Sequence, residues 1–474
     1  MVPRDSNNTF LYGPKCDALN LVKSNAACNT FRGGIYDPDK SRSKGTPASS
    51  YTPPPDRWSS TTYDMFTDSL DLGKNISIKD FPMAGPRDYR NWDLQGYDPQ
   101  NIIGMGPGST LVEASRKARR IASDAFGFYW GLDGVGDTDQ MGGSFVFGGY
   151  DKAKTYGDGH TQLLSATQAC ATRMVVSIKD IVLNFANGTD ASIFPKDNGG
   201  TLLAACIVPE RPCLMDMPLT PYFQNLLDAI KNEEWSRSVG VDFWNVVLNP
   251  NNPIFTGDLT FTLDNGLQIK IPNRQLIVPE RYVNDNGDLA VNSSRPVLRI
   301  NSLQNTTGTS LPILGRYFFT SAYLMGNRDA NQFTLWQANP TSDTNLVSVN
   351  GKNEAFAATQ SCATKPTASL APDQGDNGGT AGNATAGSSL RPGAIAGIAV
   401  GGVVIALASV GLIWWYLMRK RKARAETLAA SSNTQEAQEM PPSPKAEDVL
   451  STQGFPHFFP HEMPSEHRPA EMPA

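Results

Sequence analysis

The sequence is poor in charge and in the side chains that serve most catalytic and metal sites. Aspartate, glutamate, lysine and arginine make up 18% of the 474 residues, and the net charge is −5. No basic stripe occurs ahead of residue 419, so we expect no nucleic-acid partner. There is no Cys-x-x-Cys pair for zinc and no Gly-x-Ser-x-Gly turn, and His160 is the only histidine before residue 457. We therefore expect no metal, no cofactor and no histidine-assisted nucleophile.

One long apolar run stands out against this background. Residues 393–418 contain 26 residues without a charge, and about 20 can cross a bilayer as a helix. Aromatic residues end the run (414–416) and basic residues follow it (419–424), which places the C-terminus in the cytoplasm and the N-terminal part outside. We expect a single-pass membrane protein. Small residues recur on one face of the run, which favours a helix-mediated dimer: Gly393, Gly397 and Gly401.

Sequons and cysteines support the same topology. Six Asn-x-Ser/Thr sequons precede the run and none follows it, which predicts N-glycosylation at Asn7, Asn75, Asn187, Asn292, Asn305 and Asn383. All six cysteines lie on that side too, and an even number outside the cell suggests disulfides. The opening MVPRDSNNTF has no signal-peptide pattern. Because an outside domain needs one, we expect an N-terminally truncated or degenerate copy.

Composition divides the chain further. Residues 366–392 and 419–474 are poor in large apolar side chains, which predicts a flexible stalk and a disordered cytoplasmic tail. The remainder consists of short, turn-bounded runs, so its class is mainly β. The best hairpin signal is residues 257–272, two alternating runs around Asp264-Asn265-Gly266. Helical patterns are confined to residues 111–125 and 221–234.

Four segments in order resemble the pepsin-like aspartic peptidases, in particular divergent membrane-anchored members from filamentous fungi. They are the cysteine pair at 16 and 28 with FRGGIYDPDKSRS (31–43), NIIGMGPGSTL (101–111), GGSFVFGGYDKAK (142–154) and LPILGRYFFTSAYLMGN (311–327). The resemblance implies a bilobal fold with a substrate cleft, a truncated N-terminal lobe at 1–155 and a C-terminal lobe at 156–365. It also implies a Cys16–Cys28 disulfide. The pairing of Cys170, Cys206, Cys213 and Cys362 stays open.

Such peptidases use two aspartates that share one proton, each in an Asp-Thr/Ser-Gly loop beyond an apolar strand. A gap-free comparison places the second loop at ACIVPERPCLMDMP (205–218), with Pro209 at the aspartate position. The first loop, compared the same way, has Pro3 there. A second register would instead read Asp5 as the aspartate, with Asn7 replacing glycine. Either register leaves the pair of carboxylates incomplete.

The flap that covers substrate in this family also looks reduced. The corresponding stretch TTYDMFTDSL (61–70) is several residues short, and Tyr63 is the candidate flap tyrosine, with an ordinary turn aromatic as the alternative. The sequence thus favours a catalytically inactive, hydrolase-like surface protein that binds peptide or cell-wall polymer. Two alternatives stay open: an active aspartic endopeptidase, and a sensor that signals through residues 419–474.

Overall fold

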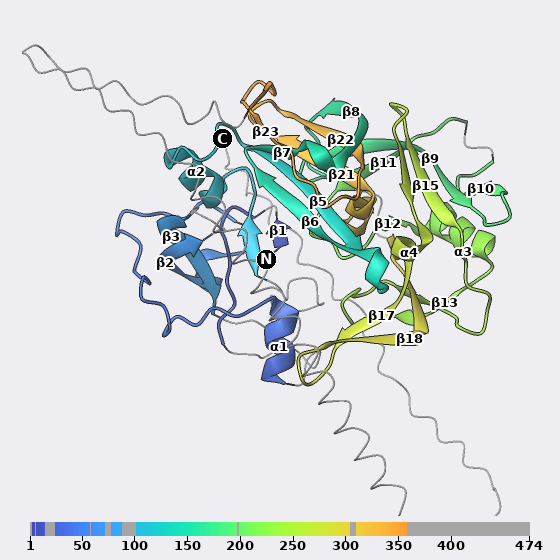
Figure 1. Ribbon diagram of the computed structural model, residues 1–474, viewed down its shortest axis with the longest axis horizontal. Coiled ribbons are helices and arrows are strands. Elements are labelled where there is room, and N and C mark those ends of the chain that lie inside the picture. Colours follow the sequence, from blue (N-terminus) through green and yellow to red (C-terminus); the bar gives the residue numbers. More distant parts are fainter. Residues whose placement is uncertain are drawn as a thin grey trace, which may run out of the picture. The chain divides into compact units, whose positions relative to one another are not determined.

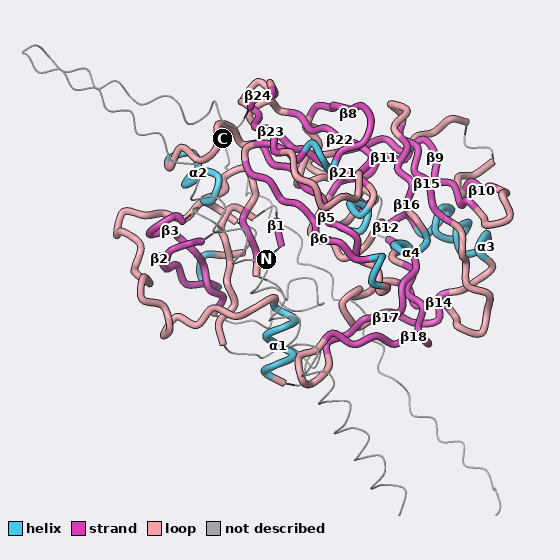
Figure 2. The backbone as a smooth tube through the Cα atoms, in the orientation of Figure 1, coloured by secondary structure: helices cyan, strands magenta, loops and turns pink. Residues whose placement is uncertain are grey.

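The computed structural model consists mainly of β-strands (Figure 2), as the sequence predicts. It describes residues 2–4, 6–14, 24–56, 58–71, 77–87, 101–196, 199–303 and 310–357. All of them belong to the first of two units, Met1–Ser369. Several predicted features lie outside the described residues: Asp5, Cys16, Asn75, Asn305, Cys362, Asn383, the stalk, the apolar run with Gly393, Gly397 and Gly401, and the tail. Among the helices that are described, none is long and apolar enough to span a membrane.

A five-stranded antiparallel sheet brings distant parts of the chain together. Its order is β6 (Gln140–Phe147), β5 (Ala125–Asp133), β21 (Ala322–Asn327), β22 (Gln332–Ala338) and β8 (Thr155–Leu163). In Figure 1 the teal strands of the middle of the chain lie beside the orange strands of its later part. Three short strands form a sheet nearby: β24 (Ala355–Ala357), β23 (Leu346–Val349) and β7 (Gly149–Asp151).

The largest sheet has eight strands and is made by residues 175–314. Its path is β16 (Gln268–Ile271), β15 (Asp258–Leu263), β9 (Val175–Asn184), β11 (Leu203–Ile207), β20 (Ile313–Leu314), β12 (Met215–Pro218) and β19 (Ile300–Leu303), with β10 (Asp190–Ser192) on β9. The pairing of β15 with β16 confirms the predicted hairpin. Gly266 has φ 88° at its turn, a conformation that glycine adopts without strain.

A four-stranded antiparallel sheet and short helices complete this part. The sheet order is β13 (Glu234–Arg237), β14 (Val246–Leu248), β18 (Leu289–Leu298) and β17 (Ile277–Val283). Helix α3 (Gln224–Ile230) falls within one predicted helical segment, and α4 (Asn273–Leu276) is a single turn. Helix α2 (Thr110–Lys117) is also shorter than its pattern suggests.

Residues 2–104 contribute two smaller sheets. β1 (Val2–Arg4) pairs in parallel with β4 (Ile102–Gly104), and β2 (Tyr63–Asp71) pairs with β3 (Ser77–Pro86). Helix α1 (Asn25–Arg32) begins at Ser24, whose side chain accepts a hydrogen bond from the backbone of Ala27, as N-cap residues do. Its last turn ends at Gly33, which has a left-handed conformation.

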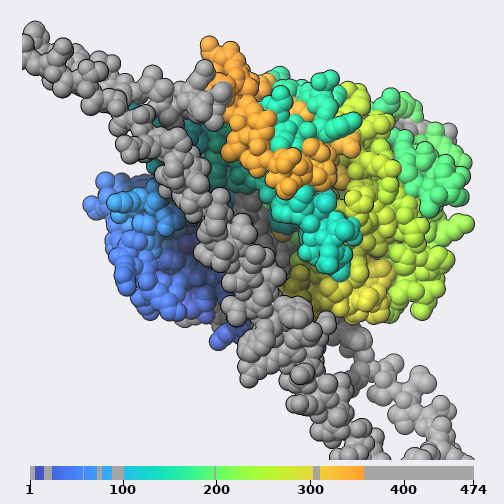
Figure 3. Space-filling model, in the orientation of Figure 1, coloured from blue at the N-terminus to red at the C-terminus, as the bar shows by residue number. Residues whose placement is uncertain are grey.

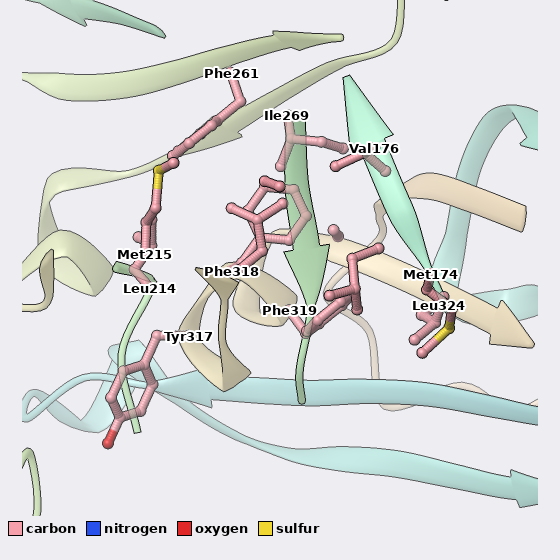
Figure 4. Close-up of a cluster of buried hydrophobic side chains, with 14 of the residues drawn as sticks. Met174, Val176, Leu214, Met215, Phe261, Ile269, Tyr317, Phe318, Phe319 and Leu324 are labelled. Carbon is pink, nitrogen blue, oxygen red and sulfur yellow. The ribbon is translucent and has the colours of Figure 1, made fainter. Parts of the chain in front are cut away.

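A continuous apolar core supports the loop that follows β11. Figure 4 shows Leu214 and Met215 in one buried cluster with Tyr317 and Phe318. All four side chains are at most 1% exposed. Burial of such side chains contributes roughly 1.5–3 kcal/mol each, so the backbone on both sides of the loop is firmly held.

Candidate functional site

The segment between β11 and β12 passes around the end of another strand. β11 pairs in parallel with β20, and β12 pairs with the opposite side of β20. The connecting residues 208–214 therefore cross over the end of β20, where Gly315 follows. A crossing of this kind places loop residues at the edge of the sheet, where side chains from different segments meet.

Backbone hydrogen bonds hold this crossing loop. Gly315 donates to the carbonyl of Leu214 (3.0 Å), Arg316 to that of Arg211 (2.9 Å) and Tyr317 to that of Cys213 (3.1 Å). A Cβ atom on Gly315 would lie 2.4 Å from the Cys213 carbonyl oxygen. Only glycine fits so close an approach. The loop thus has a tightly defined backbone.

The side chains of the loop are not those of an acid pair. Pro209 is buried and carries no ionisable group. Glu210 is 9% exposed, and its carboxylate makes no hydrogen bond or ion pair with a described residue. Arg211 makes an ion pair with Asp216, with 3.3 Å between Nη2 and Oδ2. The loop therefore offers one carboxylate beside a carboxylate that a guanidinium neutralises.

A second guanidinium lies against the same loop. Arg316 is 8% exposed and donates from Nη2 to the carbonyl oxygen of Glu210. Its guanidinium carbon lies 4.9 Å from the ring centroid of Trp130, within cation–π range. Its Nε has no hydrogen-bond partner among the described residues. The crossing loop thus combines two arginines with one unpaired glutamate.

The structure shows part of the disulfide pairing that the sequence left open. Cys170 and Cys206 form a disulfide that fixes the segment before β9 to β11. Cys213 is a buried free thiol, so the expectation that all six cysteines form disulfides is corrected there. Burial, and then the charge of Asp216, raise the pKa of the Cys213 thiol. Cys28 is disulfide-bonded, while its predicted partner lies outside the described residues.

The first candidate loop has a similar crossing, with a close approach of Gly104. A Cβ atom on Gly104 would lie 2.5 Å from the carbonyl oxygen of Asn8. Gly315 approaches the second loop equally closely. β1 and β4 are parallel, like β11 and β20. The two loops are therefore related in architecture even though their sequences differ.

Strand pairing shows that the first loop is two residues shorter than the second. Pro3 lies opposite Ile103 and Phe10 opposite Ile102, seven positions apart. In the second loop the matching pairs are Ile207 with Leu314 and Asp216 with Ile313, nine positions apart. Counted from the entering strand, the aspartate position falls on Asp5; counted from the leaving strand, it falls on Pro3. The gap-free comparison is not required by the backbone, and both assignments remain predictions.

Residues around the first loop are tied to a neighbouring segment. The Oδ2 atom of Asp56 accepts hydrogen bonds from the backbone of Asn7 (3.0 Å) and of Asn8 (2.9 Å). The Asn7 amide donates to Pro55 (2.6 Å) and accepts from Gly108 (2.7 Å). Both ends of the Asn7 side chain are thus occupied by protein. The Asp56 carboxylate therefore positions the backbone of the first loop.

Tyr63, the candidate flap tyrosine, begins β2 and is 3% exposed. Its ring packs edge-on against Phe10, with 5.3 Å between the centroids. Burial, and then the charge of Asp56, raise the pKa of its hydroxyl. These surroundings are those of a packing residue, and a role above a cleft stays a prediction.

A buried charge cluster that no sequence pattern indicated lies behind the second loop. Arg281 donates two hydrogen bonds to the carboxylate of Asp242 (2.8 and 3.0 Å). Arg299 donates a third (3.0 Å), and Asp133 makes a further ion pair with Arg281. The Arg299 guanidinium lies 3.9 Å from the ring centroid of Tyr317. The two guanidinium groups of the cluster balance its two carboxylates. Through these contacts the cluster joins β5, β17 and the helical turn after Gly315.

Asp242 has a strongly perturbed pKa. Its burial alone would raise the value, but the charges of Arg299 and Arg281 outweigh this and hold the pKa at about 2. The carboxylate is therefore ionised throughout the physiological range. Among the described residues no group of three His, Cys, Asp or Glu side chains is placed to hold a metal ion.

Comparison with a family model identifies the family of the chain. The family model of the eukaryotic aspartyl proteases matches residues 96–338, just over half of the chain. Among solved structures, the aspartic proteinase from Irpex lacteus shares 15% sequence identity and superposes with a TM-score of 0.45, covering 72% of this chain and 90% of that one. No curated protein matches. The chain belongs to the eukaryotic aspartyl protease family.

Proposed function

We propose that this protein is an aspartic-protease-like surface protein that has lost acid-pair hydrolysis and binds a peptide or a cell-surface polymer. The observation that carries the proposal is Pro209. It stands where the second loop would need its aspartate, in a loop whose backbone is otherwise held as a catalytic loop must be. Two carboxylates sharing a proton are the basis of the family's reaction. A proline cannot supply one of them.

The charges around Pro209 also oppose an acid pair. Such a pair depends on two carboxylates that repel each other, so that one of them retains a proton. Here Asp216 makes an ion pair with Arg211, and Arg316 donates a hydrogen bond to the carbonyl oxygen of Glu210. This neighbourhood suits the binding of a polar ligand better than activation of water.

Placement at the cell surface is part of the proposal. Its support is the uncharged run at 393–418 with the basic residues that follow. In two sequons the hydroxyl donates to the asparagine side chain, from Thr189 to Asn187 (2.7 Å) and from Ser294 to Asn292 (2.7 Å). Both hydroxyls are exposed, Thr189 beside a turn and Ser294 within β18. We extend the proposal to a single-pass protein glycosylated at these two positions.

The second candidate is an active endopeptidase, and the register of β1 favours it. Counted from that strand, Asp5 occupies the aspartate position of the first loop. One carboxylate could then bind a water molecule, although the second loop supplies no aspartate in the matching place. This candidate predicts a residual activity that depends entirely on Asp5.

The test is proteolysis by the full chain purified in detergent. A denatured protein substrate is incubated at acid pH with and without a statine-type transition-state mimic, next to Asp5→Asn. We expect no cleavage above that of the Asp5→Asn variant. Cleavage that the mimic inhibits and that Asp5→Asn abolishes would overturn the proposal and establish the second candidate.

A further inference from the structure

Two large aromatic side chains are exposed on the four-stranded sheet. Trp235 of β13 is 52% exposed and Tyr282 of β17 is 43% exposed. In Figure 3 the yellow residues of β17 and β18 lie at the surface and border the yellow-green residues that precede them in the chain. Exposed aromatic residues that gather on one face of a sheet mark an interaction surface, whereas scattered ones need no explanation.

The pairing of β17 with β18 shows which residues share a face with Tyr282. Glu280 lies opposite Asn292, and Tyr282 lies opposite Ala290. Side chains directly opposite each other in an antiparallel pair, and those two positions along, point to the same face. Asn292 and Tyr282 are therefore diagonal neighbours, with Cα atoms about 7–8 Å apart and within reach of an aromatic side chain. Arg281 points to the opposite face, toward the buried charge cluster.

An arginine joins this row to Trp235. Arg295 makes an ion pair with Glu280, and its Nη2 donates to the Ser236 hydroxyl (3.1 Å). Its guanidinium carbon lies 5.6 Å from the ring centroid of Trp235. Its Nη1 makes no hydrogen bond with a described residue. We call the following set the aromatic face: Trp235, Glu280, Tyr282, Asn292 and Arg295.

A glycan attachment point lies within the aromatic face. Residues 292–294 form a sequon, and residues 293–295 bulge out of the pairing of β17 with β18. The Oδ1 atom of Asn292 accepts from the Ser294 hydroxyl (2.7 Å) and backbone (3.1 Å), while its Nδ2 makes no hydrogen bond with a described residue. N-glycosylation joins Nδ2 to the sugar, breaks the bond between the sugar and its lipid diphosphate carrier, and releases one Nδ2 proton. The atom that reacts is thus unengaged.

We propose that the first sugars of an N-glycan at Asn292 lie on the aromatic face, with the first ring stacked on Tyr282 and an oxygen atom of the sugar accepting a hydrogen bond from Arg295. A sugar ring has C–H groups on its faces and oxygen atoms around its rim, which matches an aromatic ring beside a guanidinium. The glycan is the occupant because its attachment point is already in the face, so that its local concentration there is high. The inference rests on the proposed glycosylation and extends it from a modification to a covering of the sheet.

The test is hydroxyl-radical footprinting of the full chain, produced in a glycosylating host and purified in detergent. Peptide mass spectrometry gives the glycan occupancy at Asn292 and the oxidation rates of Tyr282 and Trp235. We expect Tyr282 to be oxidised several-fold more slowly in the glycosylated chain than in the variant Ser294→Ala, which removes the sequon and keeps Asn292. Tyr156 on β8, which is 69% exposed, should react at the same rate in both proteins.

Matched variants assign the protection to this glycan. Ser294→Thr preserves the sequon hydroxyl and should keep Tyr282 protected. Asn187→Gln removes a different sequon and should leave the oxidation of Tyr282 unchanged. An endoglycosidase that leaves only the first sugar should also preserve the protection of Tyr282. Loss of protection on this trimming would place the contact in the outer sugars and overturn the stacking of the first ring on Tyr282.

The remaining outcomes each contradict the inference in a different way. Full occupancy at Asn292 with equal oxidation of Tyr282 in the wild type and in Ser294→Ala would show that the glycan extends into solvent, and the proposed surface function would still stand. Slow oxidation of Tyr282 in both proteins would show that a second copy or another segment covers the face. An unoccupied Asn292 would remove this inference together with the proposed glycosylation there, whereas the proteolysis test would still decide the loss of catalysis separately.

Discussion

Asp242 offers a direct test of the charge cluster behind the second loop. The change is Asp242→Asn, which keeps the size of the side chain and removes the charge between Arg281 and Arg299. Removing one partner from a buried ion pair costs roughly 3–5 kcal/mol because the remaining charge is uncompensated. We expect the free energy of unfolding to fall by about that amount near neutral pH.

The pH dependence gives a second estimate from the same residue. The pKa of Asp242 is about 2 in the folded protein against an ordinary 3.8, a difference equivalent to about 2 kcal/mol. Since the folded value is the lower one, this stabilisation is present above pH 3.8 and is lost as the pH falls through 3.8 towards 2. The wild-type advantage over Asp242→Asn should therefore shrink in that window.

The assay is urea unfolding of the full chain in detergent, followed by tryptophan fluorescence at several pH values. Comparing the two proteins at each pH removes the contribution of all other carboxylates. A stability difference under about 1 kcal/mol at neutral pH, the size of an exposed pair, would refute the structural role of the cluster. A difference that stays constant from neutral pH to acid would refute the assigned pKa.

Three further predictions follow from contacts described above. Gly315→Ala should lower the free energy of unfolding by roughly 1–3 kcal/mol, because its Cβ meets backbone at 2.4 Å, whereas Gly142→Ala, with open space around it, should change it little in the same urea titration. If the proposed glycosylation occurs, glycosidase treatment should shift the electrophoretic mobility of the full chain, and the combined variant Asn187→Gln, Asn292→Gln should reduce that shift; an unchanged shift would contradict glycosylation at these positions. The Cys213 thiol, buried and with a raised pKa, should react with a maleimide only after unfolding, and rapid labelling of the native protein would show that the loop opens.

Part of the fold can be predicted from local patterns in the sequence. The hairpin of β15 and β16 is set by alternation around Gly266, and the second crossing loop is bounded by apolar residues that do pack in the core. The apolar residues on both sides of that loop are enough to predict that Pro209 stands at the aspartate position. These features depend on residues close together in the chain, and the sequence therefore indicates them.

Features made by distant residues could not be read in the same way. Asp242 meets Arg281 and Arg299 only because a loop, strand β17 and the end of β18 converge, and no spacing in the sequence predicts this. The two-residue difference between the loops appears only once strands are paired. Cys213 looked like a disulfide partner because a count of cysteines cannot tell which of Cys206 or Cys213 faces Cys170.

The five-stranded sheet has a consequence for how the protein is made. Phe128 of β5 pairs with Leu324 of β21, about 200 residues later in the chain. At a synthesis rate of about 5–20 residues per second, the first of these strands waits about 10–40 s for its neighbour to leave the ribosome. During that time the edge of β5 that pairs with β21 has no partner strand. Productive folding in the cell then depends on keeping this nascent strand shielded until translation has passed residue 338.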